Sequence, residues 1–250
     1  MTPEEIFDKL HQEALNNPDV LGFFLSGSRG KGFEHEHSDY DIYFVVRDDT
    51  VSSFRETHPF KYAPNTECIV YGLSEFEAYA QPGSDTAWDR YSFAHVTVLV
   101  DKTETIQALV DDKGALPQPA DAYLAAQLDG YINAVFRGFK SHRKSDALAA
   151  RLHAHVSLNH LLNLMFGLED RLAPYYDYLR LELTHYPLSA FPLTSQDLLT
   201  KIEIISRTAS VEVQQELFAK IELLCRARGL GYVYEDWGSS YTLLKRFNAT

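Results

Sequence analysis

The stretch from Gly27 to Val46 contains the residues best suited to chemistry. A Gly27-Ser28 turn follows an apolar run, and Asp39 and Asp41 open the next strand-like run. The period-two alternation of a strand puts both carboxylates on one face, about 7 Å apart. Carboxylate oxygens are the hard ligands that Mg²⁺ prefers, and a Gly-Ser turn lets backbone N–H groups approach phosphate oxygens closely. The pattern therefore indicates a site for phosphates and a divalent cation.

Strands and helices must alternate around this stretch to hold it in place. Thr2 and Glu5 form a capping box around Pro3, which predicts a helix to about Asn17. Apolar and alternating runs predict four strands, each about the length of a typical strand. The predicted strands are 21–25, 38–46, 67–71 and 95–100, with helices opening at Ser74 and Asp101 after the last two.

The pattern changes near residues 114–119, where two prolines mark a linker. Beyond this linker helical periodicity dominates and strand signals nearly vanish. Helices are predicted over 121–141, 146–172, 175–184, 195–206 and 211–228. The sequence therefore predicts an α+β protein of two domains. Residues 1–115 form a mixed sheet flanked by helices, and residues 116–250 form an all-α helical bundle.

The Gly27-Ser28 turn, a spacer of ten residues and the Asp39-x-Asp41 strand resemble the signature of the nucleotidyltransferase superfamily that includes DNA polymerase beta. The order of the two domains resembles that of the aminoglycoside nucleotidyltransferases. The resemblance implies that the first domain is a nucleotidyltransferase domain. It also implies an Mg²⁺-dependent, pyrophosphate-releasing enzyme that moves a nucleoside monophosphate, expected to be AMP, from a nucleoside triphosphate such as ATP to a hydroxyl of a small molecule.

The resemblance also implies roles for individual residues. Asp39 and Asp41 match the ligands of two Mg²⁺ ions. The family usually has a third carboxylate on a neighbouring strand, and we expect it at Glu67, which begins a strand-like run. Asp101 is better explained as a helix cap. The general base is left open among Glu67, Asp89 and a carboxylate of the helical domain.

Four residues of the turn are expected to bind the triphosphate: Gly27, Ser28, Arg29 and Lys31. Lys140 belongs to a basic cluster at residues 140–144 that could also reach the phosphates from the second domain. Cations at the end of a helix that offset its dipole explain that cluster at least as well. Tyr175, Tyr176 and Trp237 could line an acceptor pocket, although aromatic residues more often belong to a core.

Charge narrows the choice of partners. Residues 1–115 have 9 lysines and arginines against 21 aspartates and glutamates, which accounts for the whole net charge of −12. A domain this acidic repels nucleic acid and attracts cations, so a cationic acceptor is expected. The resemblance implies that this acceptor is of the aminoglycoside type and that the role is antibiotic resistance. A regulatory or toxin–antitoxin module that acts on a protein partner is the alternative.

The protein is expected to be located in the cytoplasm. Cys68 and Cys225 are too few for a disulfide framework, the N-terminal residues lack the order of a signal peptide, and no apolar run of 18 residues suggests a membrane span. Both cysteines are expected to be buried. A homodimer is possible.

Overall fold

The computed structural model describes residues 1–248 and divides them into two compact units, Met1–Pro117 and a second unit that begins at Gln118. The first unit contains a five-stranded mixed sheet with helices, and every strand of residues 1–248 lies in it. The α+β fold class is therefore confirmed. The division falls two residues beyond the position expected from the prolines.

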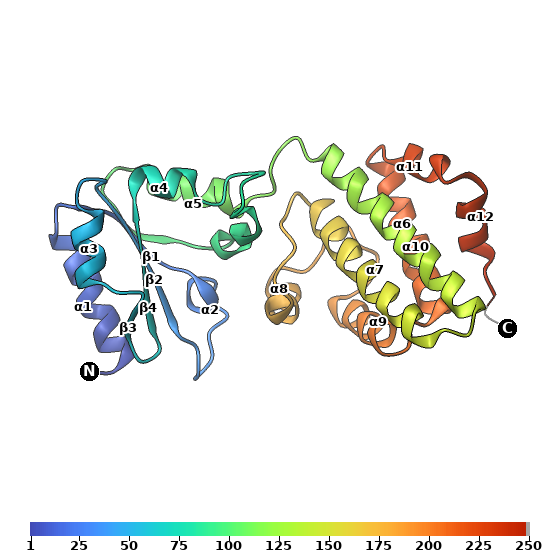
Figure 1. Cartoon of the computed structure of the whole chain (residues 1–250), viewed down its shortest axis with the longest axis horizontal. Helices are drawn as coiled ribbons and strands as arrows, with labels where there is room; N and C mark the ends of the chain where they lie inside the picture. The colour runs from blue at the N-terminus through green and yellow to red at the C-terminus, as the bar shows by residue number, and fades with distance from the viewer. Residues whose placement is uncertain (249–250) are drawn as a thin grey trace. The chain divides into compact units, whose positions relative to one another are not determined.

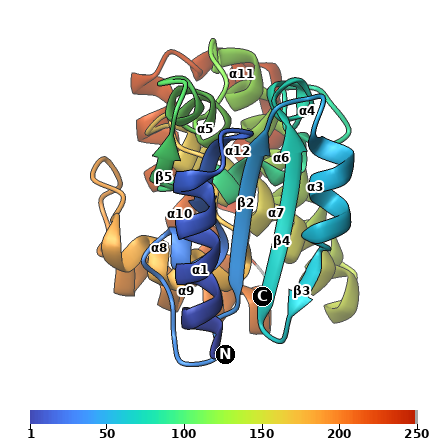
Figure 2. The ribbon, with the colours of Figure 1, turned by 90° about the vertical axis from the view of Figure 1, so that its left-hand side faces the viewer.

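The sheet has the strand order β3-β4-β2-β1-β5. β2 and β4 are parallel, whereas the other three neighbouring pairs are antiparallel. A parallel pair needs a crossover, and α3 lies within the segment that provides it (Figure 2). The strands are β1 (Val20–Leu25), β2 (Tyr40–Val46), β3 (Lys61–Ala63), β4 (Thr66–Gly72) and β5 (Val98–Asp101).

Helices cover both faces of this sheet, because the strands alternate between two apolar clusters. On one face Ile42 and Phe44 pack with residues of α1 and α3, which lie on the same side of the sheet in Figure 1. On the other face Tyr43 and Val45 pack with residues of α4, η1 and α5. These elements are α1 (Pro3–Asn16), α3 (Val51–Thr57), α4 (Leu73–Ala78), the 3-10 helix η1 (Ala87–Phe93) and α5 (Ile106–Gly114).

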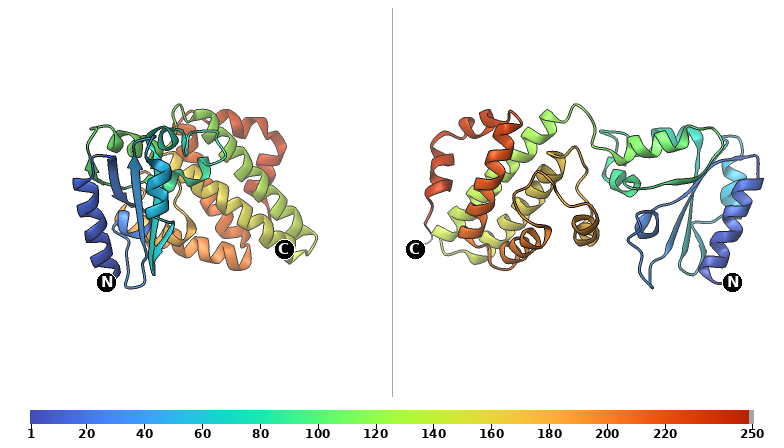
Figure 3. Two further views of the ribbon diagram at one scale, coloured as in Figure 1. Left: turned by 60° about the vertical axis from the view of Figure 1, so that its left-hand side comes forward. Right: turned by 180° about the vertical axis from the view of Figure 1, so that it is seen from behind.

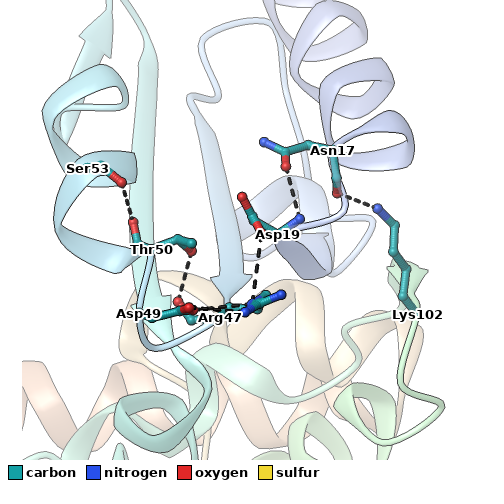
Figure 4. Close-up of polar contacts among 7 residues, drawn as sticks. All are labelled: Asn17, Asp19, Arg47, Asp49, Thr50, Ser53 and Lys102. Carbon is teal, nitrogen blue, oxygen red and sulfur yellow. Dashed lines mark hydrogen bonds and ion pairs between the residues drawn. The ribbon is translucent and has the colours of Figure 1, made fainter.

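Polar contacts fix the end of the sheet where β1 begins and β2 ends. Arg47 pairs with Asp49 at 3.0 Å and with Asp19 at 3.9 Å, and the backbone N–H of Asp19 donates to the side chain of Asn17 (Figure 4). The Lys102 ammonium donates to the carbonyl of Asn17 at 2.7 Å. These contacts therefore fix the β1–β2 pair at the end opposite to Asp41. The Gly-Ser bend lies at the other end, next to Asp41.

Most predicted elements of the first unit form, with shifted ends. The helix expected from Asp101 begins at Ile106, because the Asp101 carboxylate accepts the backbone N–H groups of Thr103, Thr105 and Gln107 and organises a turn first. The capping box of α1 forms as predicted. The short elements α3, β3 and η1 are additions to the prediction.

The second unit is helical, and its two long helices α6 and α7 pack side by side (Figure 3). The inner face of α6 buries Leu124, Leu128 and Ile132 at helical spacing. Among residues 1–248 no helix is both long and apolar enough to cross a membrane. The elements are α6 (Asp121–Arg143), α7 (Ala147–Gly167), η2 (Tyr176–Tyr178), α8 (Leu179–His185), α9 (Ser195–Thr208), α10 (Val211–Ala227), α11 (Gly231–Asp236) and α12 (Gly238–Arg246). Both cysteines are buried, as expected.

Candidate active site

The Gly-Ser bend lies directly against the Asp41 side chain. After β1 the chain turns into α2 (Gly27–Gly30), and the backbone N–H of Ser26 donates to the carbonyl of Asp41 at 2.9 Å. Gly27 has φ +58°, and a Cβ at Gly27 would lie 1.9 Å from Oδ2 of Asp41. Only a residue without a side chain therefore allows this carboxylate to sit on the bend.

Asp41 belongs to a cluster of carboxylates. It is the second residue of β2 and partly buried, whereas Asp39 precedes the strand and is exposed. Burial raises the pKa of Asp41 above its ordinary value of 3.8, and the negative charges of Glu67 and Asp39 raise it further. The charge of Asp39 thus acts on the Asp41 carboxylate beside the bend.

Glu67 joins this cluster through the parallel strand pair. Asp41 and Glu67 are Cα partners in the register of β2 and β4, so they occupy adjacent strands at the same level. The Glu67 carboxylate, however, contacts the ammonium group of Lys61, its register partner on β3. Glu67 and, more weakly, Asp39 and Asp41 raise the pKa of Lys61.

This ion pair involves one of the three carboxylates of the expected metal site, and that site stays a prediction. In the described residues no group of three or more His, Cys, Asp or Glu side chains is arranged to hold a metal ion. Lys61 supplies positive charge to the Glu67 carboxylate. Asp39 and Asp41 are then the two carboxylates that could donate oxygen atoms to a metal ion. A donor set of two carboxylates still fits Mg²⁺, which usually takes one or two from the protein. Burial and the charges of Glu67 and Asp39 raise the pKa of Asp41, and the positive charge of Lys61 offsets this only in part.

Arg29 is engaged with the loop that leads into Asp39. Its Nε and Nη2 atoms donate to the carbonyl of Ser38 at 3.2 and 3.0 Å, and its guanidinium stacks over the Tyr40 ring at 3.9 Å. Ser38 and Tyr40 are the neighbours of Asp39 in the chain. In this structure Arg29 therefore positions the Asp39 backbone, and any role with phosphates remains a prediction.

Lys31 is not available to phosphates, contrary to the prediction. It is only 4% exposed, and its ammonium donates to the carbonyls of Tyr91, Ser92 and Ala94 at 2.7 to 2.9 Å. Ser26 adds a hydroxyl bond to the Ser92 carbonyl at 2.8 Å. Both side chains tie the bend to the end of η1, because a buried ammonium needs acceptors and these carbonyls provide them.

Replacing Lys31 with methionine is expected to destabilise the fold by about 3 kcal/mol, since it leaves buried carbonyls without their donor. Chemical denaturation measures this loss. Lys9→Met, at an exposed position on α1, is the matched control and should leave stability nearly unchanged. Unchanged stability in Lys31→Met, together with weaker nucleotide binding, would restore the phosphate-binding role.

Asp89, one candidate for the general base, is buried in the structure. Its carboxylate accepts the Tyr79 hydroxyl at 2.9 Å and the Ser92 hydroxyl at 2.5 Å, one on each oxygen. These bonds hold η1 against the end of α4. Asp89 thus has a structural role, which leaves Glu67 as the carboxylate nearest to Asp41 in register.

Lys140 is the one predicted site residue in the second unit. It lies on α6 and lines a hollow there with Trp237, within the bundle. Tyr175 and Tyr176, the other aromatic candidates, line a separate hollow of about 410 Å³ in the same unit. The binding of a triphosphate by Lys140 remains a prediction.

Lys61 is the residue of the cluster that the sequence analysis did not single out. A signal for it exists, because Pro64-Asn65 is a turn sequence between two short strand-like runs and predicts a hairpin. Asn65 adopts φ +56° in that turn, and the hairpin brings Lys61 opposite Glu67.

Comparisons with known proteins add little to this geometry. No family model matches the chain, and no curated protein matches it. One similar solved structure is that of a nucleotidyltransferase-like protein from Exiguobacterium sibiricum 255-15. The match has 12% sequence identity and a TM-score of 0.42, and it covers 96% of this chain and 77% of the other. At this score and identity the match does not bear on function.

Proposed function

We propose that the chain is a nucleotidyltransferase that moves a nucleoside monophosphate, AMP, from a nucleoside triphosphate to a hydroxyl group of a small molecule. The observation that supports this most is the packing of the Asp41 carboxylate on the Gly27 bend, with Asp39 beside it. This arrangement puts a pair of carboxylates next to backbone N–H groups that can bind phosphate.

In the proposed reaction the acceptor oxygen forms a bond to the α-phosphorus, and the bond from that phosphorus to the bridging oxygen breaks. The bridging oxygen leaves with pyrophosphate, and the acceptor proton passes to a carboxylate, for which we favour Glu67. Bound Mg²⁺ would supply neutralisation of the charge that develops on the phosphate oxygens, with Asp39 and Asp41 as its protein ligands. The Gly27-Ser28 bend orients the triphosphate, and Arg29 keeps Asp39 in place.

A cationic acceptor, of the aminoglycoside class, suits the charge of the chain. The first unit has a net charge of −12, which attracts cations over distance. In the second unit Tyr175, Tyr176 and Asp177 line the 410 Å³ hollow, and the Tyr176 hydroxyl donates to Asn159 at 2.9 Å. Aromatic faces beside a carboxylate are suitable contacts for an ammonium group.

Thermal unfolding with ATP tests the proposal directly. A ligand that binds only the native state at 100 times its Kd stabilises that state by about 2.7 kcal/mol, so ATP with Mg²⁺ should raise the melting temperature clearly. ATP with a chelator should raise it less. An equal shift with and without Mg²⁺, or no shift at all, would contradict the cation-dependent site.

Labelled ATP with a panel of aminoglycosides tests the acceptor. We expect transfer of label to at least one member, with pyrophosphate released in equal amount. Nucleotide binding without transfer to any member would remove the antibiotic as acceptor.

The second candidate is a regulatory module that binds nucleotide and acts on a protein partner. The Lys61–Glu67 pair favours it, because in this structure the third expected carboxylate is paired with a lysine. A stoichiometric partner whose binding survives Asp41→Asn would support this candidate.

A further inference from the structure

The hollow around Lys140 in the second unit has a chemistry that the proposed reaction does not use. It measures about 290 Å³, near the lower end for a small-molecule pocket. Its lining includes Phe136, Arg137, Lys140, Lys144, His153 and Trp237, and no lining residue is acidic. Arg137 and Lys140 share one face of α6 through their spacing, Lys144 is the residue that caps the end of this helix, and His153 comes from α7.

The cations of this hollow are not neutralised by carboxylates. In the described part of the chain Arg137, Lys140 and Lys144 form no ion pair. Arg137 donates to the side chain of Asn133 at 3.1 Å, and the Lys140 ammonium lies 5.3 Å from the Phe136 ring centroid. All three cations are exposed, and an anion that entered the hollow would be attracted by their combined positive charge.

The dipole of α6 does not account for this arrangement. Cations in the last turn of a helix offset its C-terminal charge, an effect that fades beyond that turn. Lys140 and Lys144 satisfy this explanation. Arg137, however, lies six residues before the helix ends, and His153 belongs to another helix.

Trp237 gives the hollow a fixed aromatic wall. Its Nε1 donates to Asp129 at 2.8 Å, and its ring meets the Phe136 ring edge-on with centroids 5.8 Å apart. These contacts hold the indole in place next to the cations. An indole beside several cations is suited to a ligand whose phosphates reach the cations and whose remaining part contacts the ring.

We propose that this hollow binds a polyphosphate group, either inorganic or as part of a nucleotide, and that this binding does not require the Asp39–Asp41 pair. Arg137, Lys140 and Lys144 hold the phosphate oxygens, and Trp237 contacts the ligand from the side. The site goes beyond the proposed transfer reaction and does not depend on it.

Tryptophan fluorescence tests the proposal, because the chain has two tryptophans and Trp88 is in the first unit. In the Trp88→Phe variant the signal comes from Trp237 alone. Titration with tripolyphosphate, without Mg²⁺, is expected to give a saturable change. Adding Lys140→Gln and Lys144→Gln should weaken binding by at least about tenfold, because charge-assisted bonds to phosphate are lost.

Arg143→Gln is the matched control. It removes one cation from the same helix end, where Arg143 stacks on the Phe247 ring outside the hollow, and it should leave binding unchanged. Each lysine variant is also made singly, and circular dichroism verifies that the helices persist. A ligand that binds tighter as ATP than as tripolyphosphate is a nucleotide, and equal affinities indicate phosphate alone.

Three results would overturn the proposal. The first is no saturable change with either ligand, and the second is an equal loss of binding in Arg143→Gln. The third is loss of binding in Asp41→Asn, which would make the hollow part of the proposed active site. If the protein shows no transferase activity but the Trp237 fluorescence still responds to tripolyphosphate, the proposed function fails and the phosphate site is supported. The two proposals are therefore tested separately.

Discussion

Asp41→Asn is expected to slow nucleotidyl transfer by about 1000-fold, a loss of about 4 kcal/mol of transition-state stabilisation. The amide keeps the shape of the side chain but removes the negative charge that would hold Mg²⁺ beside the Gly27 bend. Rates of pyrophosphate release with ATP, Mg²⁺ and acceptor measure this effect. Asp39→Asn should show a similar loss, because both carboxylates are proposed to hold the same cations.

The same substitution should make the protein more stable at neutral pH when divalent cations are absent. The folded state raises the pKa of Asp41 above its ordinary value of 3.8, so it holds this proton more tightly than the unfolded chain does. The protonated group therefore favours folding below pH 3.8, and stability is lost as the pH rises through the folded-state pKa. Asp41→Asn has no carboxylate to ionise, so it avoids this loss of stability at neutral pH. The difference in stability between the variant and the wild type should therefore disappear at low pH.

Thermal melts at neutral and acidic pH check this second effect. Asp8→Asn, at an exposed position on α1, is the control and should change neither the rate nor the stability by much. An Asp41→Asn protein that transfers nucleotide at the wild-type rate would contradict the proposed function. One that is less stable at neutral pH would show that the carboxylate is structural.

Gly27→Ala is expected to have the second large effect. It should slow nucleotidyl transfer at least 100-fold, which corresponds to a loss of about 3 kcal/mol of transition-state stabilisation. A Cβ at this position would overlap Oδ2 of Asp41, so the carboxylate must rotate away from the bend. The overlapping atom is the end of a side chain, so beyond the backbone strain at this position most of the cost should appear in the rate rather than in folding. Denaturation and transfer assays on one sample separate the two.

Gly32→Ala provides a matched control on the same loop. Gly32 has φ +69°, close to the +58° of Gly27, but no atom lies within 4 Å of its added Cβ. Both substitutions therefore cost about 1 to 2 kcal/mol of backbone strain in the left-handed region. Only Gly27→Ala should also lose activity. Equal losses of activity in both variants would mean that backbone strain, and not contact with Asp41, explains the effect.

Much of the first unit was predictable because its signals are local. A capping box, the alternation of Tyr40, Ile42 and Phe44 and the Gly-Ser bend each depend on neighbours in the chain. The predicted strands therefore form, with ends shifted by a few residues. Short elements such as β3 and α3 were not predicted, because three to seven residues contain too little periodicity to stand out.

The sequence by itself determined that two carboxylates stand close together after a glycine bend, since the spacing of Asp39 and Asp41 and the shape of glycine are properties of the chain. Tertiary structure decided what surrounds them. The parallel register of β2 and β4 brings Glu67 beside Asp41, and the β3 hairpin gives Glu67 a lysine partner. Packing against η1 turned Lys31 from a predicted phosphate ligand into a buried anchor. These outcomes depend on which segments distant in sequence become neighbours, and local residue patterns do not contain that information.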